Sequence, residues 1–319
     1  MSVKSRLQHL RNDKKLGLSF SQIYLREFDR EKDKICSKII YRCSGCDEKA
    51  YEASHAAFVY KRIKNRYHGF LLADKPIRDS AWYKKKLPKI IWWCWLQGEE
   101  KIPDLSKFCL NSLEQNISDY DIKIITLANL HKYIDLPSSI YLKYKAGWIS
   151  GALFSDIIRL ALLAKYGGIW IDSTVYCSSN DLIKVIEENN MFVYKNVMTS
   201  NSSVIKMSSW LMASKKNNPY IIDASHLLIK YCKERNYTED YFICHLILTL
   251  LSNKYYDIWN KISLFNNIDP HMLQYVLNEQ FSDDLFNRIK SKSSFHKLNR
   301  HIKFSEGETF YNYIRSEKK

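Results

Sequence analysis

Three charged residues of the sequence, Asp156, Arg159 and Asp172, have types and spacings that suit one reactive cluster. Asp156 and Arg159 lie three residues apart, a spacing that puts both side chains on one face of a helix. Asp172 follows the apolar segment 169–171, where a strand would end. Two carboxylates and a guanidinium that converge can hold hydroxyl groups and anionic oxygens, because the guanidinium is a planar fork of donors.

The sequence around this cluster predicts a helix, a glycine turn and a short buried strand. Residues 152–166 are a run of Leu, Ile and Ala that is typical of a buried helix. Gly167 can adopt the left-handed conformation that closes a helix, and Gly168 permits a sharp reversal into the strand 169–171. In open α/β sheets, ligands bind beyond the carboxyl ends of the strands. We therefore expect Asp172 to project into a crevice that the helical pair also faces.

The two motifs S-D-x-x-R (155–159) and G-G-I-W-I-D-x-T (167–174) resemble those of the capsular polysaccharide synthesis family of sugar transferases. More distantly, they are similar to glycosyltransferases with a DXD motif, including the glucosyltransferase domains of the large clostridial toxins. The resemblance implies an α/β fold of GT-A type, with a mostly parallel nucleotide-sugar-binding sheet flanked by helices. It also implies transfer from a nucleoside-diphosphate sugar, a UDP-sugar, with retention of the anomeric configuration, to a glycan or lipid-linked acceptor in surface polysaccharide synthesis.

The resemblance implies Mn²⁺ or Mg²⁺ as cofactor, but the chain departs from the DXD pattern at Thr174. The more distant relatives carry an aspartate there that holds the metal directly, whereas threonine offers a weak neutral oxygen. We expect Asp172 to bind the ribose and, directly or through water, a weakly held cation, with Thr174 beside it. Asp156 and Arg159 would hold the donor sugar hydroxyls, and the fork of Arg159 would also lie close to the phosphates.

A continuous apolar segment at 89–98, bounded by Pro88 and Gly98, predicts a buried first strand. The pattern L-P-K-I-I-W-x-x-W-x-x-G resembles the opening strand of the same family, in which the tryptophan at the position of Trp95 stacks on the nucleotide base. An indole face is worth about 1–3 kcal/mol in base stacking. The alternative is that the tryptophans here only pack the core, which we expect for Trp93 more than for Trp95.

Two further segments resemble the family. The segment 239–245 is expected to open an apolar helix and is similar to a D-Y-F-x-x-H motif, so Asp240 and His245 are candidate catalytic residues, through acceptor contact or proton transfer. A buried, hydrogen-bonded histidine is the alternative. The second segment, 295–298, resembles an H-K-L motif near the donor diphosphate. It makes Lys297 a candidate phosphate-binding residue and His296 a candidate metal ligand. The neighbouring residues 300–303 can equally form a plain basic surface.

The sequence predicts a basic helical region at 1–86 and a GT-A-type glycosyltransferase domain at 87–319, with 75–88 as the linker. Within the second part we expect helices at 105–116, 138–145 and 220–233 and strands at 121–126 and 192–197, with another element at 204–213. This alternation predicts a sheet of parallel strands with covering helices.

We expect a globular protein of the cytoplasm, from the composition and from the lack of long apolar runs. Of 319 residues, 46% are hydrophobic, which excludes a fully disordered chain. Neither a membrane-spanning run nor the apolar core of a signal peptide is present in the sequence. The 8 cysteines lack a regular pattern and indicate reduced thiols, and the lone C-x2-C at 43–46 lacks the second ligand pair of a structural zinc site.

The formal charge of +15 is concentrated near the N-terminus, because residues 1–86 carry 21 Lys and Arg against 10 Asp and Glu. Such a segment attracts anionic lipid headgroups, nucleic acid or acidic glycans. We expect a peripheral association with the inner face of an anionic membrane and do not expect nucleic acid as a partner, although a solubilising helical face is an equal alternative. The rival function is a basic membrane-surface or nucleic-acid-binding protein whose transferase-like domain is inert.

Overall fold

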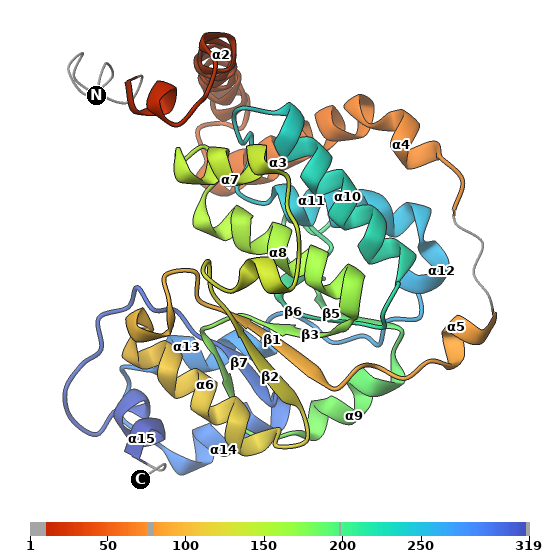
Figure 1. Ribbon diagram of the computed structural model, residues 1–319. Coiled ribbons are helices and arrows are strands. Elements are labelled where there is room, and N and C mark those ends of the chain that lie inside the picture. Colours follow the sequence, from red (N-terminus) through yellow and green to blue (C-terminus); the bar gives the residue numbers. More distant parts are fainter. Residues whose placement is uncertain (1–10, 76–79, 198, 317–319) are drawn as a thin grey trace.

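The computed structural model describes residues 11–75, 80–197 and 199–316. The described residues form a central five-stranded sheet with helices on both faces (Figure 1). Its strands, in spatial order, are β2 (Asp121–Ile125), β1 (Ile90–Cys94), β3 (Gly168–Ile171), β6 (Met207–Ser214) and β5 (Met191–Lys195). The predicted strands at 121–126, 169–171 and 192–197 are therefore confirmed, and the element at 204–213 is a strand. The strand predicted at 89–98 is also present but is shorter, because it ends at Cys94.

The sheet is mixed, so the expectation of a mostly parallel sheet holds only in part. β1 pairs in parallel with β2 and β3, whereas β6 runs antiparallel to both β3 and β5. A parallel return requires a crossover connection, usually a helix. The described residues of the connection 196–206 form turns instead, so β6 returns beside β5 in the opposite direction.

Side chains of β1 alternate between two hydrophobic cores, one on each face of the sheet. Trp92 packs into the core under α8 and α10, whereas Ile91 and Trp93 pack into the core under α6 and α9. The helices of the first face are α7 (Ser138–Lys145), α8 (Gly151–Tyr166), α10 (Pro219–Glu234), α11 (Ile243–Lys254) and α12 (Tyr256–Trp259). Those of the second face are α6 (Asp104–Asn116) and α9 (Asp181–Glu188).

α8 ends and β3 begins at two glycines with positive φ, as the sequence predicts. Gly167 has φ +73° and Gly168 φ +95°. A Cβ atom on Gly168 would lie 2.5 Å from the carbonyl oxygen of Ile90 in the neighbouring strand. The turn that aims Asp172 therefore needs glycine both for its backbone conformation and for the close approach of β1.

Gly168→Ala should destabilise the fold by about 3 kcal/mol, because it adds backbone strain to a steric clash with a β-strand. Gly147→Ala is the matched control: Gly147 also has a positive φ of +72°, but no described atom lies within 4 Å of the added Cβ. Gly147→Ala should lower the free energy of unfolding by about 1 kcal/mol. Urea denaturation of both variants measures the difference, and equal losses would contradict the role of the close approach.

The C-terminal part of the chain adds a small two-stranded sheet and a third hydrophobic cluster, to which α6 also contributes side chains. Strand β4 (Val175–Cys177) pairs antiparallel with β7 (Phe295–Lys297). The surrounding helices are η3 (Asp269–His271), α13 (Met272–Val276), α14 (Asp283–Lys292) and α15 (Phe310–Ser316). The pairing places residues 295–298 next to the segment that follows Asp172, although the paired residues are about 120 positions apart in sequence.

The N-terminal region is helical in its described part, as predicted. Its helices are α2 (Phe20–Cys43), α3 (Glu48–Arg66), α4 (His68–Leu72) and α5 (Ser80–Lys84). Ala56, Val59 and Ile63 of α3 belong to the same core as α8, α10 and α11. The boundary at 86/87 stays a prediction, and residues 1–10 and 76–79 of the predicted region and linker lie outside the described residues. Within the described part of the chain, no helix combines the length and apolar character needed to cross a membrane.

Candidate functional site

A cavity of about 750 Å³ opens where β1 and β3 end, and it brings together most of the residues singled out in the sequence. Asp156 and Arg159 of α8 enter it from one side, and Asp172 and Thr174 follow β3 into it. The other lining residues that bear on its chemistry are Trp95, Gln97, Tyr241, His245, Lys297, Arg300 and His301.

Arg159 lies between the two carboxylates. Its Nη2 donates to Asp172 Oδ1 at 2.8 Å, and its Nη1 donates to Asp156 Oδ1. The guanidinium also lies 4.9 Å from the ring centroid of Trp170, whose Nε1 donates to the same oxygen of Asp172 at 2.8 Å. Only 4% of the Arg159 side chain is exposed, so the pair of carboxylates compensates a buried cation.

The environments of the two carboxylates separate their pKa values. Burial raises the pKa of Asp156 to about 6, despite the opposing effect of Arg159. Burial also disfavours the charged form of Asp172, but Lys297 and Arg159 outweigh it and lower the pKa to about 2. Asp172 is therefore a permanent anion at neutral pH.

Lys297 bridges the two polar groups of the D-x-T motif. Its Nζ lies 2.9 Å from Asp172 Oδ2 and 2.9 Å from Thr174 Oγ1. The register of β4 and β7, with Val175 opposite Lys297, brings the ammonium there, and Leu298 N donates to the carbonyl of Thr174 at 2.8 Å. A fixed cation thus occupies the place between the two side-chain oxygens.

This arrangement does not fit a divalent cation held by Asp172 and Thr174. Lys297 already contacts both side chains, and one carboxylate with one hydroxyl is a poor ligand set for Mg²⁺ or Mn²⁺. Over residues 11–75, 80–197 and 199–316, no three His, Cys, Asp or Glu side chains gather into a possible metal site.

His296, a candidate metal ligand in the sequence, lies outside the cavity. Neighbouring residues of a strand point to opposite faces, so the register that brings Lys297 to the cavity turns His296 away from it. The imidazole is fully buried, lies 3.0 Å from Ser178 Oγ and stacks near Tyr176. Burial lowers its pKa to about 3. We therefore leave His296 out of the proposed site.

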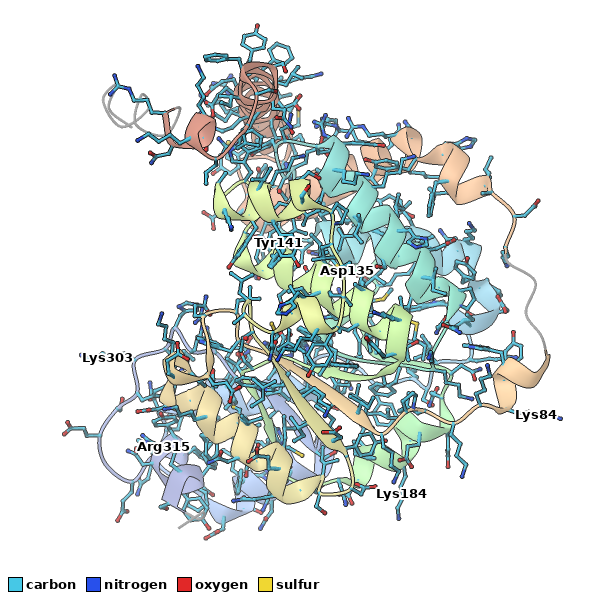
Figure 2. All side chains as sticks on the ribbon, in the orientation of Figure 1. Lys84, Asp135, Tyr141, Lys184, Lys303 and Arg315 are labelled. Atoms are coloured by element: carbon cyan, nitrogen blue, oxygen red, sulfur yellow. The ribbon has the colours of Figure 1, made fainter. Side chains whose placement is uncertain are left out.

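Trp95 lines the cavity next to Arg300. The sequence had not decided whether Arg300 belongs to the site or to a plain basic surface. The guanidinium of Arg300 lies 5.3 Å from the centroid of the Trp95 ring, and the buried indole Nε1 has no hydrogen-bond partner among the described residues. Arg300 and His301 line the cavity, whereas Lys303 points into solvent (Figure 2). Of the basic residues that follow the H-K-L segment, Arg300 and His301 therefore belong to the cavity lining, whereas Lys303 does not.

The segment 239–245 contributes to the cavity differently from the prediction. α11 begins at Ile243, not at Glu239, and Tyr241 and His245 line the cavity. Burial lowers the pKa of His245 to about 4, so its imidazole is neutral at neutral pH, and its buried Nδ1 has no partner in the described structure. Asp240 lies outside this cavity, 3.0 Å from His55 Nδ1 of α3.

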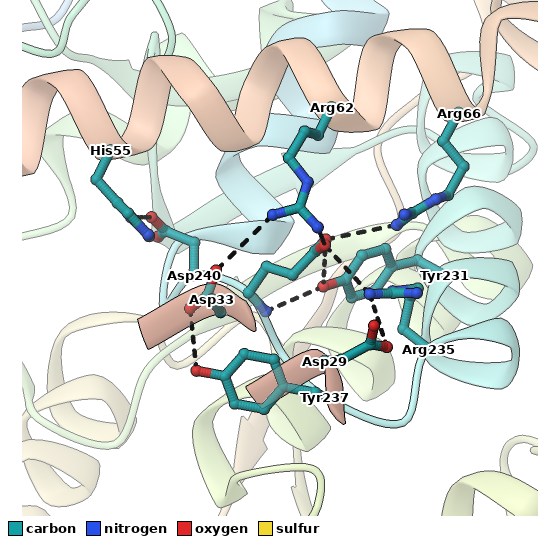
Figure 3. A network of polar contacts seen from close by, with 10 residues as sticks. Asp29, Asp33, His55, Arg62, Arg66, Tyr231, Arg235, Tyr237 and Asp240 are labelled. Carbon is teal, nitrogen blue, oxygen red and sulfur yellow. Dashed lines mark hydrogen bonds and ion pairs between the residues drawn. The ribbon is translucent and has the colours of Figure 1, made fainter. Parts of the chain in front are cut away.

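A buried ionic network fixes this segment to the N-terminal helices (Figure 3). The carboxylate of Glu239 lies 2.6 Å from Arg62, 3.6 Å from Arg66 and 3.3 Å from Arg235. Arg235 also reaches Asp29 of α2 at 2.9 Å. Part of the positive charge of residues 1–86 is therefore compensated inside the protein.

The His55–Asp240 contact predicts a pH-dependent stability. Asp240 raises the pKa of His55, which also faces Asp33 and Arg62, so the contact stabilises the fold fully below the unfolded-state pKa of about 6.5. This stabilisation is lost as the pH rises through the higher folded-state pKa. The stability advantage of the wild type over His55→Gln should therefore decrease between about pH 6 and pH 8. Urea denaturation at both pH values measures it; a constant difference would contradict the ion pair.

Three other lining residues, Ser209, His271 and Gln274, belong to no motif that the sequence displays. Ser209 lies on β6, the antiparallel strand, and the other two lie on η3 and α13. Their approach depends on the packing of the C-terminal helices, so no local pattern in the sequence could have identified them.

Comparison with known proteins gives one extensive match. The family model described as "Capsular polysaccharide synthesis protein" matches residues 43–314. Among curated proteins, none matches the sequence significantly. Among solved structures, the PaToxG glycosyltransferase is similar at a TM-score of 0.40 and 14% identity, over 74% of this chain and 95% of that one. A transferase mutant is similar at a TM-score of 0.33 and 10% identity, over 58% of this chain and 90% of that one. Neither TM-score is high enough to support a functional argument.

Proposed function

Because the chain belongs to the capsular polysaccharide synthesis protein family, we propose that it is a glycosyltransferase that moves a sugar from a nucleoside-diphosphate donor to a glycan or lipid-linked acceptor. One observation carries the proposal: the anion Asp172 is fixed between Arg159 and Lys297 at the edge of a large polar cavity. Such a cavity offers charges of both signs to a ligand that combines hydroxyl groups with a diphosphate.

In this proposal the donor spans the cavity, with its base at Trp95 and its sugar at α8. The base stacks on Trp95 in place of Arg300, which turns toward the diphosphate beside Lys297. Asp172 accepts hydrogen bonds from the ribose, and Asp156 with Arg159 holds the sugar hydroxyls. Nε1 of Trp95 and Nδ1 of His245 are buried and have no hydrogen-bond partner among the described residues, which supports a ligand that supplies these hydrogen bonds. A UDP-sugar and retention of configuration follow from the family resemblance.

The chemistry requires neutralisation of a leaving group. As the anomeric bond breaks, negative charge grows on the diphosphate, and preorganised cations stabilise it most effectively in a site shielded from water. Lys297 and Arg159 are such cations, because Asp172 already holds both in place. His245 is neutral and suits a hydrogen bond with the acceptor hydroxyl rather than the role of a cationic acid. Asp240 positions Tyr241 and His245 through its contact with His55.

Donor binding tests the proposal. The full chain is melted alone and with UDP, UDP-glucose, UDP-galactose and the GDP- and dTDP-sugars. A donor at about 100 times its Kd stabilises the folded state by about 2.7 kcal/mol and raises the melting temperature. The matching sugar-free nucleoside monophosphate serves as control. A chain that responds to none of these compounds would contradict the proposal.

The exposed face of α2 supports approach to an anionic membrane. Its apolar side chains, each more than half exposed, recur with helical spacing along the outer face: Phe20, Tyr24, Phe28, Ile35 and Ile39. In Figure 1, α2 projects from the body of the protein, away from the sheet. A basic helix with an exposed apolar stripe suits the membrane interface.

The double substitution Phe20→Ser, Phe28→Ser should weaken binding to vesicles containing phosphatidylglycerol about tenfold, because it removes apolar area that would be buried in the interface. Vesicle co-sedimentation measures the loss, and the melting temperature should stay unchanged. Leu264→Ser, which alters another exposed apolar residue, is the control. Unchanged binding of the double variant would remove α2 from the membrane contact.

A further inference from the structure

A second cavity of about 770 Å³ lies beside the first, between α2, α3 and the loop 237–242. Four of its lining residues carry aromatic rings that remain at least partly exposed: Tyr51, Tyr237, Tyr241 and Phe242. The ionic network of Figure 3 forms one of its walls, since Asp33, His55 and Asp240 line it. Buried charges therefore fix one wall of this cavity, while its partly exposed aromatic rings offer surface on which a ligand can pack.

The two cavities meet along a short ridge. Tyr241 lines both, and this residue is 72% exposed. At the N-terminus of α8, Ser150 lines the second cavity and the next residue, Gly151, lines the first. A chain-like ligand in the second cavity can thus place its end over Tyr241 and into the first cavity.

One buried carboxylate oxygen of the second cavity has no hydrogen-bond partner among the described residues. Asp33 is 7% exposed and lines the cavity; its Oδ2 accepts from Tyr237 at 3.2 Å, whereas its buried Oδ1 has no hydrogen bond in the described structure. Arg62, at 3.8 Å from this oxygen, is too far for one. Buried polar groups are nearly always satisfied, so Oδ1 is an acceptor available to a ligand hydroxyl.

We propose that this second cavity is the acceptor groove, and that it binds the terminal sugars of an uncharged glycan. The inference rests on the proposed function. Aromatic rings pack on the C–H faces of pyranoses, and carboxylates accept hydrogen bonds from their hydroxyls. The groove is lined by the four carboxylates Asp33, Glu52, Glu239 and Asp240 against the two lysines Lys34 and Lys38, with His55 beside them. The lining therefore carries no excess of positive charge that would attract a polyanionic glycan.

The groove places the reacting hydroxyl next to the donor. The oxygen of the terminal sugar passes Tyr241 and forms a bond to the anomeric carbon. The bond from that carbon to the diphosphate breaks, and its electron pair leaves with the nucleoside diphosphate. The hydroxyl proton leaves with the diphosphate as well. Donor and acceptor therefore enter from opposite sides of the ridge.

Two variants test the groove without altering the donor cavity. Ser37→Trp fills the groove from α2, and Tyr51→Ala removes an aromatic surface of α3. Tyr256→Ala, which removes an exposed tyrosine outside both cavities, is the matched control. The probes are uncharged gluco-, galacto- and manno-oligosaccharides, free and lipid-linked, and uronate-containing oligosaccharides. Their binding to the full chain is followed by saturation-transfer NMR in the presence of UDP.

We expect uncharged fragments to bind the wild type and the control, and both groove variants to lose at least tenfold in affinity while the melting shift with UDP stays unchanged. A lipid-linked fragment that binds tighter than the free one identifies the lipid as part of the acceptor. Binding that survives in Ser37→Trp, preference for uronate-containing fragments, or no binding of uncharged fragments would each overturn the inference. If UDP does not raise the melting temperature of the wild type, the result would instead count against the proposed function.

Discussion

Asp172→Asn should lower the rate of sugar transfer about a thousandfold, equivalent to about 4 kcal/mol of transition-state stabilisation. Asp172 is the shared partner of Arg159 and Lys297, two of the cations that we assign to the departing diphosphate. Asparagine keeps the shape but removes the charge, and its amide nitrogen would face one of these donors. Both cations would then lose the orientation in which they stabilise the leaving group.

The measurement is single-turnover transfer with the nucleotide sugar that gives the largest melting shift. Asp121→Asn is the control, because Asp121 is an exposed carboxylate on an edge strand, paired only with Lys123 among the described residues. The control should retain wild-type activity. Asp172→Asn should remain folded by circular dichroism, and a folded variant with near-normal turnover would remove Asp172 from the mechanism.

The cluster of Asp156, Arg159 and Asp172 could be predicted because local patterns determine its geometry. Helical spacing fixes the pair on α8, and two glycines with positive φ fix the turn into β3. Each step involves residues close in sequence, for which periodicity and glycine placement are reliable signals. Most of the other strands of the sheet could also be predicted, from short apolar segments of the sequence.

The remaining features depend on contacts between distant parts of the chain. His296 and Lys297 differ only in the face of β7 to which they point, and that depends on the register with β4. Asp240 pairs with His55, 185 residues away. The antiparallel direction of β6 and the approach of His271 and Gln274 likewise follow from tertiary packing. A resemblance of motifs indicates which segments matter, but it does not determine which side chain of a segment enters the cavity.

The position of Lys297 changes what the threonine of the D-x-T motif implies. In a D-x-D site a second carboxylate adds a negative charge that a divalent cation compensates. Here the neutral Thr174 leaves a single charge on Asp172, and one ammonium between the two side chains balances it. The motif and the lysine are thus one electrostatic unit, and we propose that it replaces a directly held metal ion at the diphosphate.

Lys297→Met should therefore weaken UDP binding about 30-fold, or about 2 kcal/mol, because it removes a charge-assisted hydrogen bond and leaves Asp172 without its second cation. Isothermal titration of the wild type with UDP should give the same affinity with Mn²⁺ and with excess EDTA. Lys303→Met, which removes an exposed lysine outside the cavity, should bind like the wild type in both buffers. UDP binding that requires Mn²⁺ in the wild type, together with normal binding by Lys297→Met, would show that a metal ion carries the charge that we assign to the lysine.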